Sequence, residues 1–77
     1  MLTMYTTRWC GYCVRLKSRL EREGIAYTEV NIENDRGAAE LVMTVNGGNR
    51  TVPTLVFPNG TALTNPTLEQ VKQQLAA

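Results

Sequence analysis

Two cysteines three positions apart, Cys10 and Cys13, are the side chains of this sequence best suited to covalent chemistry. They follow a short strand pattern and precede a helix pattern that begins near Gly11. The free N–H groups and positive dipole end of a helix start favour a thiolate over a thiol, so we expect the pKa of Cys10 to fall below the usual value of about 8.5. Cys13 lies one turn further along, where its sulfur can attack a disulfide on Cys10. The spacing predicts a nucleophilic Cys10 and a resolving Cys13 in thiol–disulfide exchange.

Two other uses of the cysteine pair are open at this point. A disulfide between them would close a loop of only four residues and stabilise the fold by roughly 2 kcal/mol, less than a longer loop would. A zinc site would need four ligands, and the chain has two cysteines and no histidine. Redox chemistry is therefore the favoured interpretation, and we expect no bound metal.

Composition limits the setting of this chemistry. The 77 residues, 43% of them hydrophobic, predict one domain over residues 1–77 with a single modest core. A net charge of +1 and the lack of a basic run give no reason to expect a nucleic-acid partner. No segment approaches the roughly 20 apolar residues that span a membrane, and no charged-then-apolar leader opens the chain. We therefore expect a cytoplasmic protein with no membrane partner.

Hydrophobic periodicity predicts two steps of strand then helix in the first half of the chain. A strand at residues 2–6 precedes a helix from about Gly11 to Glu23, which Gly24 ends. Alternation over residues 26–32 predicts a second strand at a sheet edge, followed by a helix over residues 36–46. The side chains expected to face inward are Cys13, Leu16, Leu20, Ala26, Thr28, Val30, Ile32, Ala38, Leu41, Val42 and Val45. The pair Gly47-Gly48 then offers a left-handed helix stop.

The second half of the chain predicts a hairpin and a closing helix. Strands at residues 54–57 and 61–64 are joined through Asn59-Gly60, a strong tight-turn signal. The last helix starts either with Asn65 as its cap and Pro66 at its first position, or with a capping box of Thr67 and Gln70. Its inward side chains would be Leu68, Val71 and Leu75. A right-handed crossover makes the first two strands parallel, so the order β-α-β-α-β-β-α predicts an α/β fold with helices flanking a mixed four-stranded sheet.

The motifs together resemble the glutaredoxin family of the thioredoxin fold. The early Cys10-Gly11-Tyr12-Cys13, the Thr51-Val52-Pro53 triplet about forty residues later, the hairpin and the closing helix match over essentially the whole chain. The segments at residues 9–13, 45–54 and 63–66 are similar, more narrowly, to the mycoredoxins, which are glutaredoxin-like enzymes of bacteria whose small thiol is mycothiol.

This resemblance implies a mechanism and its partners. The Cys10 thiolate would attack a protein–mycothiol mixed disulfide at the mycothiol sulfur, and a second mycothiol would then free Cys10. Cys13 would be dispensable in this route, although it can form the Cys10–Cys13 disulfide as a side path or serve in the reduction of protein disulfides. The resemblance also implies mycothiol as co-substrate with no bound cofactor, mycothiolated or disulfide-containing proteins as partners, and a separate NADPH-dependent reductase for oxidised mycothiol. We expect a monomer.

The same resemblance assigns residues that bind the substrate. Pro53 would be a cis proline facing the dithiol, a state that only about 5% of X–Pro bonds adopt. In the Thr51-Val52-Pro53 triplet, the backbone of Val52 would then hydrogen-bond the thiol compound in a short antiparallel pairing; the alternative is an ordinary strand entry. Tyr12 would form a wall of the substrate groove and Trp9 its rim, unless both are partly packed surface residues.

Basic residues near the cysteines are a weaker signal. Arg8 stands where glutaredoxin-like proteins often hold a basic side chain that stabilises the thiolate or reaches the ligand, and a solvated arginine is an equal alternative. Along the first helix, Arg15, Arg19 and Arg22 either attract anionic partners or simply form its wet face.

The segment before the last helix departs from the glutathione-using pattern. Glutaredoxins that use glutathione usually carry Gly-Gly followed by Cys-Asp or Ser-Asp there, where they hold a carboxylate, but residues 63–67 of this chain lack the acidic residue. Pro66 also removes one N–H donor from the helix start. Thr64 and Asn65 would instead serve the hydroxyls of a sugar–inositol ligand, so we prefer mycothiol to glutathione.

Two functions from other classes are kept as alternatives. The first is a glutaredoxin-like electron donor, for example to ribonucleotide reductase, that thioredoxin reductase feeds. Such donors usually show a Trp-Ser-Gly-Phe-type segment before the last helix, which this chain lacks. The second is a dimeric module that holds an iron–sulfur cluster between two Cys10 thiolates and two small thiols.

Overall fold

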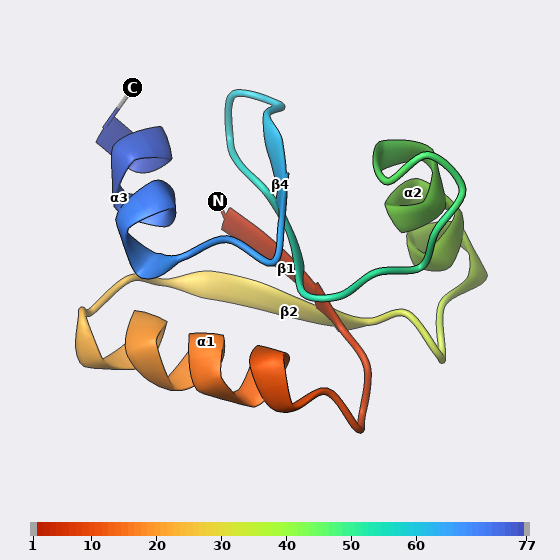
Figure 1. Ribbon diagram of the computed structural model, residues 1–77, viewed down its shortest axis with the longest axis horizontal. Helices are drawn as coiled ribbons and strands as arrows, with labels where there is room; N and C mark the ends of the chain where they lie inside the picture. Colours follow the sequence, from red (N-terminus) through yellow and green to blue (C-terminus); the bar gives the residue numbers. More distant parts are fainter. Residues whose placement is uncertain (1, 77) are drawn as a thin grey trace.

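The computed structural model describes residues 2–76 and has the predicted order of strands and helices. The elements are β1 (Leu2–Thr6), α1 (Gly11–Arg22), β2 (Tyr27–Asn31), α2 (Arg36–Val45), β3 (Thr54–Val56), β4 (Ala62–Thr64) and α3 (Leu68–Ala76). Figure 1 shows α1 and α3 on one side of the sheet and α2 on the other. Within the described residues, no helix is long and apolar enough to cross a membrane.

The four strands form one mixed sheet in the order β2-β1-β3-β4. β1 pairs with β2 in parallel, whereas β1 with β3 and β3 with β4 are antiparallel. Met4 of β1 therefore stands between Glu29 of β2 and Leu55 of β3. This topology confirms the parallel first pair, the position of β2 at an edge and the hairpin, whose turn contains Gly60 at a φ of 88°.

Helices on both faces divide the core into two clusters. The larger cluster lies between the sheet and the helices α1 and α3, and its buried members are Leu2, Met4, Cys13, Leu16, Leu20, Leu55, Phe57 and Val71. The smaller cluster lies under α2 and comprises Ile32, Ala38, Ala39 and Val42. Cys13 thus belongs to the larger core, which fixes the start of α1 against the sheet.

Three predicted core positions are wrong. Leu41, Val45 and Leu75 are 40%, 37% and 40% exposed, respectively. In α2 the predicted Ala38 and Val42 are buried, and Ala39 is buried in place of Leu41 and Val45, because the side of the helix that meets the sheet carries these three positions. In α3 only the first half of the helix reaches the core, so Leu75 lies one turn beyond the packed surface.

The prediction that residues 26–32 pack inward on one face is correct only in part, since Ile32 is buried at 6% exposure but the face is not buried along its whole length. Tyr27 packs against the larger cluster and Val30 against the smaller one, while Ala26 and Thr28 are exposed. The physical reason is that β2 is an edge strand of a sheet covered on both sides, so each face contributes only the side chain that a helix reaches.

At the start of α3 the structure decides between the two N-terminal caps that the sequence allowed. Thr67 Oγ1 accepts a hydrogen bond from the N–H of Gln70, and Gln70 Oε1 accepts one from the N–H of Thr67, at 3.1 and 2.9 Å. This is a reciprocal capping box. Asn65 is not the cap but adopts a left-handed conformation with a φ of 46°, which asparagine tolerates better than most residues.

Candidate active site

Cys10 and Cys13 form a disulfide at the start of α1, with their Cα atoms 5.1 Å apart. Cys10 is the N-cap of α1, and its Sγ accepts a hydrogen bond from the N–H of Cys13 at 3.0 Å. Cys13 is only 1% exposed, whereas Cys10 is half-buried. Because a backbone donor points at Cys10 Sγ and Cys10 is the more exposed of the two residues, the geometry favours Cys10 as the first thiol to react; its lowered pKa stays a prediction.

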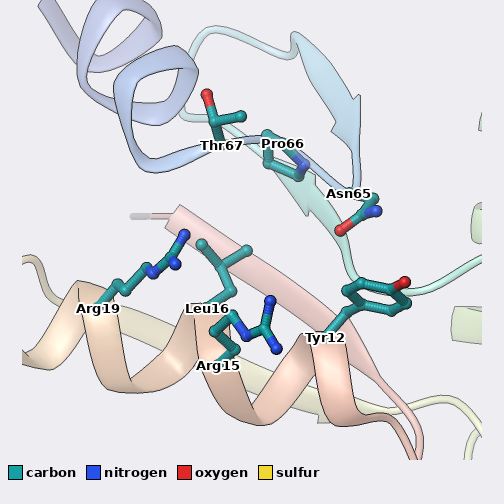
Figure 2. A pocket seen from close by; sticks show the side chains of 7 residues that line it. All are labelled: Tyr12, Arg15, Leu16, Arg19, Asn65, Pro66 and Thr67. Atoms are coloured by element: carbon teal, nitrogen blue, oxygen red, sulfur yellow. The ribbon is translucent and has the colours of Figure 1, made fainter.

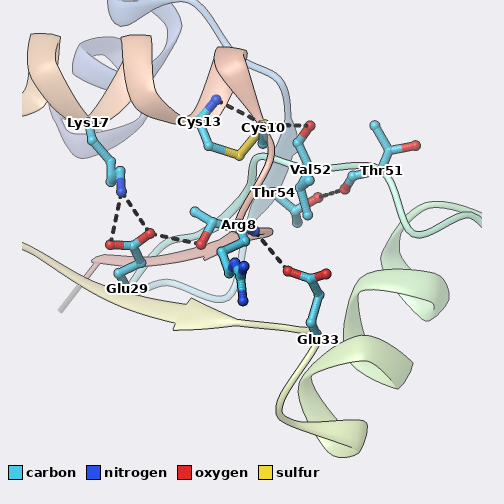
Figure 3. The surroundings of a disulfide bond; sticks show 10 residues. Arg8, Cys10, Cys13, Lys17, Glu29, Glu33, Thr51, Val52 and Thr54 are labelled. Atoms are coloured by element: carbon cyan, nitrogen blue, oxygen red, sulfur yellow. Dashed lines mark hydrogen bonds and ion pairs between the residues drawn. A yellow bond between two sulfur atoms is a disulfide. The ribbon is translucent and has the colours of Figure 1, made fainter.

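The segment at residues 51–53 lies against the disulfide (Figure 3). The Val52–Pro53 peptide bond is cis, and the carbonyl oxygen of Val52 lies 3.8 Å from Cys10 Sγ. Among residues 2–76, no hydrogen bond engages the N–H of Val52. The backbone of Val52 therefore offers both a donor and an acceptor beside the reacting sulfur.

Asn46 holds this segment in place, and the sequence did not single it out. Its Nδ2 donates to Thr54 Oγ1 at 3.0 Å and to the carbonyl oxygen of Thr51 at 3.4 Å, and it also reaches the carbonyl oxygen of Val42 at the end of α2. Thr54 Oγ1 in turn donates to the carbonyl oxygen of Thr51 at 2.8 Å. One amide side chain thus ties α2, β3 and the residue before Val52 together. Asparagine at a helix end is a common capping residue, so its type alone gave no signal of this role.

The two predicted ligand residues before α3 have different surroundings. The hydroxyl of Thr64 donates to Asn46 Oδ1, so it is already used within the fold. Asn65 donates its N–H to the carbonyl oxygen of Pro53 at 2.7 Å, and its side chain lines a cavity that Tyr12 also lines (Figure 2). The structure therefore brings Asn65 and Tyr12 together and places Thr64 in the scaffold behind them.

The remaining predicted residues, Arg8 and Trp9, lie just before Cys10. Arg8 stacks over the ring of Trp9, with 5.3 Å from its Cζ to the ring centroid, and its backbone N–H donates to Glu33 Oε1 at 2.8 Å. Trp9 is 84% exposed. Such exposure of a large aromatic side chain next to a reactive sulfur fits a contact surface better than a packed position, while the Arg8 guanidinium is engaged with the indole.

A polar network beneath the site involves a residue that the sequence did not reveal. The buried hydroxyl of Thr6 donates to Glu29 Oε2 at 2.8 Å, and Lys17 of α1 pairs with the same oxygen at 3.0 Å (Figure 3). Burial by itself raises the pKa of Glu29, but the hydrogen bonds from Lys17 and Thr6 and the charge of Lys17 outweigh it and hold that pKa below the ordinary value. The network fastens α1 to the β1–β2 pair.

We expect this network to make a small contribution to stability that depends on pH. Because the folded protein lowers the pKa of Glu29, the stabilisation is present above the unfolded pKa of about 4.5 and is lost as the pH falls through the folded value. The effect should not exceed about 1 kcal/mol, since the pair is partly exposed. Urea unfolding between pH 3 and 7 should show a flatter profile for Glu29→Gln than for Glu40→Gln, whose exposed carboxylate serves as control. Identical profiles would contradict the assignment.

Comparison with known proteins places this geometry in a class. A family model described as Glutaredoxin matches residues 2–62. A protein of Mycobacterium tuberculosis, provisionally named a glutaredoxin, is 61% identical over 74 residues, which cover 96% of this chain and 88% of that protein. Mycoredoxin 1 of Corynebacterium glutamicum is 40% identical over 76 residues and is covered to 94%, with 99% of this chain.

Solved structures agree on the fold. A crystal structure of a thioredoxin-like protein superimposes with a TM-score of 0.80 at 25% identity, covering 95% of this chain and 97% of that one. A glutaredoxin from Archaeoglobus fulgidus gives a TM-score of 0.80 at 23% identity, with 99% and 86% covered.

The chain belongs to the glutaredoxin family. It is a glutaredoxin-like thiol–disulfide oxidoreductase, and Cys10 and Cys13 are its CxxC active-site pair.

Proposed function

We propose that this protein reduces mixed disulfides between proteins and mycothiol, mainly through Cys10 alone. The observation that carries the proposal is the contrast between the two sulfurs, since Cys10 is accessible beside the Val52 backbone and Cys13 is enclosed in the core. Mycothiol is favoured over glutathione by the 40% identity to mycoredoxin 1. It is also favoured because residues 63–67, the segment where glutaredoxins that use glutathione usually carry an acidic residue, contain none.

The proposed reaction balances in two exchanges. In the first exchange the Cys10 thiolate attacks the mycothiol sulfur, and a new disulfide forms between Cys10 and mycothiol. The cysteine of the mycothiolated protein, called the client below, leaves as a thiolate. A second mycothiol thiolate then attacks the mycothiol sulfur on Cys10, which releases mycothiol disulfide and restores the Cys10 thiolate. The N–H of Cys13, 3.0 Å from Cys10 Sγ, would stabilise the negative charge that Cys10 carries at the start and end of the cycle.

A second exchange route uses both cysteines. In the mixed disulfide between Cys10 and a client protein, attack of the Cys13 thiolate on Cys10 Sγ would release the client cysteine as a thiolate and leave the Cys10–Cys13 disulfide that the structure holds. The observed disulfide favours this route for clients with an internal disulfide, and it would be reopened by mycothiol. We propose both routes for one cytoplasmic, monomeric enzyme without a bound cofactor, supported by a separate NADPH-dependent reductase that recycles mycothiol disulfide.

The choice of small thiol is tested by steady-state kinetics. One model peptide carrying a single cysteine is prepared as its mycothiol and its glutathione mixed disulfide, each paired with the matching reduced thiol and recycling reductase. We expect kcat/KM to be at least about tenfold higher with mycothiol, a difference worth about 1.4 kcal/mol of transition-state binding. Equal or faster turnover with glutathione would contradict the mycothiol assignment while leaving the family assignment intact.

A further inference from the structure

A cavity of about 190 Å³ opens between α1 and the segment that joins β4 to α3 (Figure 2). Tyr12, Arg15 and Arg19 line it from α1, and Asn65 and Thr67 line it from the opposite wall. Figure 2 shows the side chains of Arg15 and Arg19 extending toward this opposite wall. Among the described residues no acidic side chain lines the cavity, so its lining carries two positive charges and the polar groups of one amide and two hydroxyls.

The two arginines have no counter-charge within the described part of the chain. They lie four residues apart on one face of α1, both are exposed, and the ion pairs found among residues 2–76 are Lys17–Glu29 and Lys72–Glu23. Lys17 of the same helix is thus neutralised, whereas Arg15 and Arg19 are not. A guanidinium group presents a planar set of five N–H donors that matches a carboxylate, so the pair is suited to an anion.

The cavity is joined to the reaction centre through both of its walls. Tyr12 lies between the two cysteines in sequence. On the other wall, Asn65 donates its N–H to the carbonyl oxygen of Pro53, and the neighbouring Val52 carbonyl lies 3.8 Å from Cys10 Sγ. A client protein whose mixed disulfide reaches Cys10 Sγ therefore lies close to the mouth of the cavity.

We propose that Arg15 and Arg19 bind an acidic side chain of the client protein, so that clients with aspartate or glutamate near the reactive cysteine are preferred. The inference rests on the proposed function, because it concerns the protein that carries the mixed disulfide. The sugar–inositol arm of mycothiol has hydroxyls but no charge, so it leaves the two guanidinium groups unmatched. A carboxylate supplies the complementary charge, which raises the rate of encounter and fixes the register of the client.

Two matched peptides test this inference. Each carries one cysteine as its mycothiol mixed disulfide, flanked on both sides by two glutamates in one peptide and by two glutamines in the other. For the unaltered enzyme we expect kcat/KM to be about fivefold higher with the glutamate peptide, as two exposed charge pairs permit, and the ratio should shrink as salt is added. In Arg15→Gln/Arg19→Gln the ratio should fall to about one. Arg22→Gln, which removes a charge from the same helix outside the cavity, should keep the full ratio.

A charge reversal supplies the second variant. Arg15→Glu/Arg19→Glu should prefer a peptide flanked by lysines, because repulsion replaces attraction at the same positions. The proposal is overturned if the unaltered enzyme treats the glutamate and glutamine peptides alike, or if the double glutamine variant keeps the ratio of Arg22→Gln. It is also overturned if the arginines change only the choice between mycothiol and glutathione, since the small thiol would then occupy the cavity. Failure to turn over either mycothiolated peptide would instead refute the proposed function, and the charge ratio is then measured with glutathionylated peptides.

Discussion

Replacing Cys10 with serine should abolish turnover of mycothiolated protein, whereas replacing Cys13 with alanine should leave at least about half of it. Serine is nearly isosteric but its hydroxyl stays protonated and forms no disulfide, so no exchange can begin. Cys13 is 1% exposed and takes no part in the two-step exchange with mycothiol. The rate of release of client thiol, followed with a mycothiolated peptide and the recycling reductase, measures both effects.

Circular dichroism of both variants is the control, because Cys13 belongs to the larger core cluster. Full folding of Cys13→Ala with equal loss of turnover in the two variants would mean that the route through both cysteines dominates. Residual turnover in Cys10→Ser above the uncatalysed rate would remove Cys10 from its proposed role.

Replacing Leu55 with alanine should cost about 2–5 kcal/mol of the free energy of unfolding. Leu55 is fully buried in β3, paired with Met4 of β1 and Leu63 of β4, so truncation leaves a cavity in the centre of the sheet. A domain of this size has a total stability of only about 4–12 kcal/mol, and the variant would lose a large share of it. Urea unfolding followed by tryptophan fluorescence and circular dichroism gives the difference.

The matched control for this variant is Leu41→Ala, which removes the same atoms from a leucine that is 40% exposed on α2. It should cost less than about 1 kcal/mol, because most surface substitutions have small effects. Equal losses at the two leucines would contradict the position of the core relative to the sheet.

The order of elements was predictable because strands and helices carry different hydrophobic periods, and because glycine and proline mark their ends. The failures at Leu41, Val45 and Leu75 have one cause. Both α2 and α3 carry more apolar side chains than the small sheet can cover. Only tertiary packing decides which of these side chains are buried. At β2 the alternating pattern of the sequence did not predict that side chains from both faces of the strand pack against helices.

The candidate site also has one part that the sequence predicted and one part that only the folded structure revealed. The spacing of Cys10 and Cys13 pointed to redox chemistry without further help, and the resemblance to glutaredoxins supplied the cis state of Pro53. The link from Asn46 to the residues before Pro53, and the burial of Thr6 over Glu29, depend on segments that meet only in the folded chain. No local pattern of residue types encodes such contacts.

The most direct test of a Cys10 exchange with mycothiol is the mass of the trapped intermediate in the Cys13→Ala protein. The reduced variant is mixed with one equivalent of a mycothiolated peptide, quenched with acid, and analysed whole and after digestion. We expect one mycothiol on the Cys10-containing fragment and free peptide thiol in equal amount. Attachment of the peptide to Cys10, with release of mycothiol, would contradict attack at the mycothiol sulfur, and the absence of any adduct would contradict the mechanism as a whole.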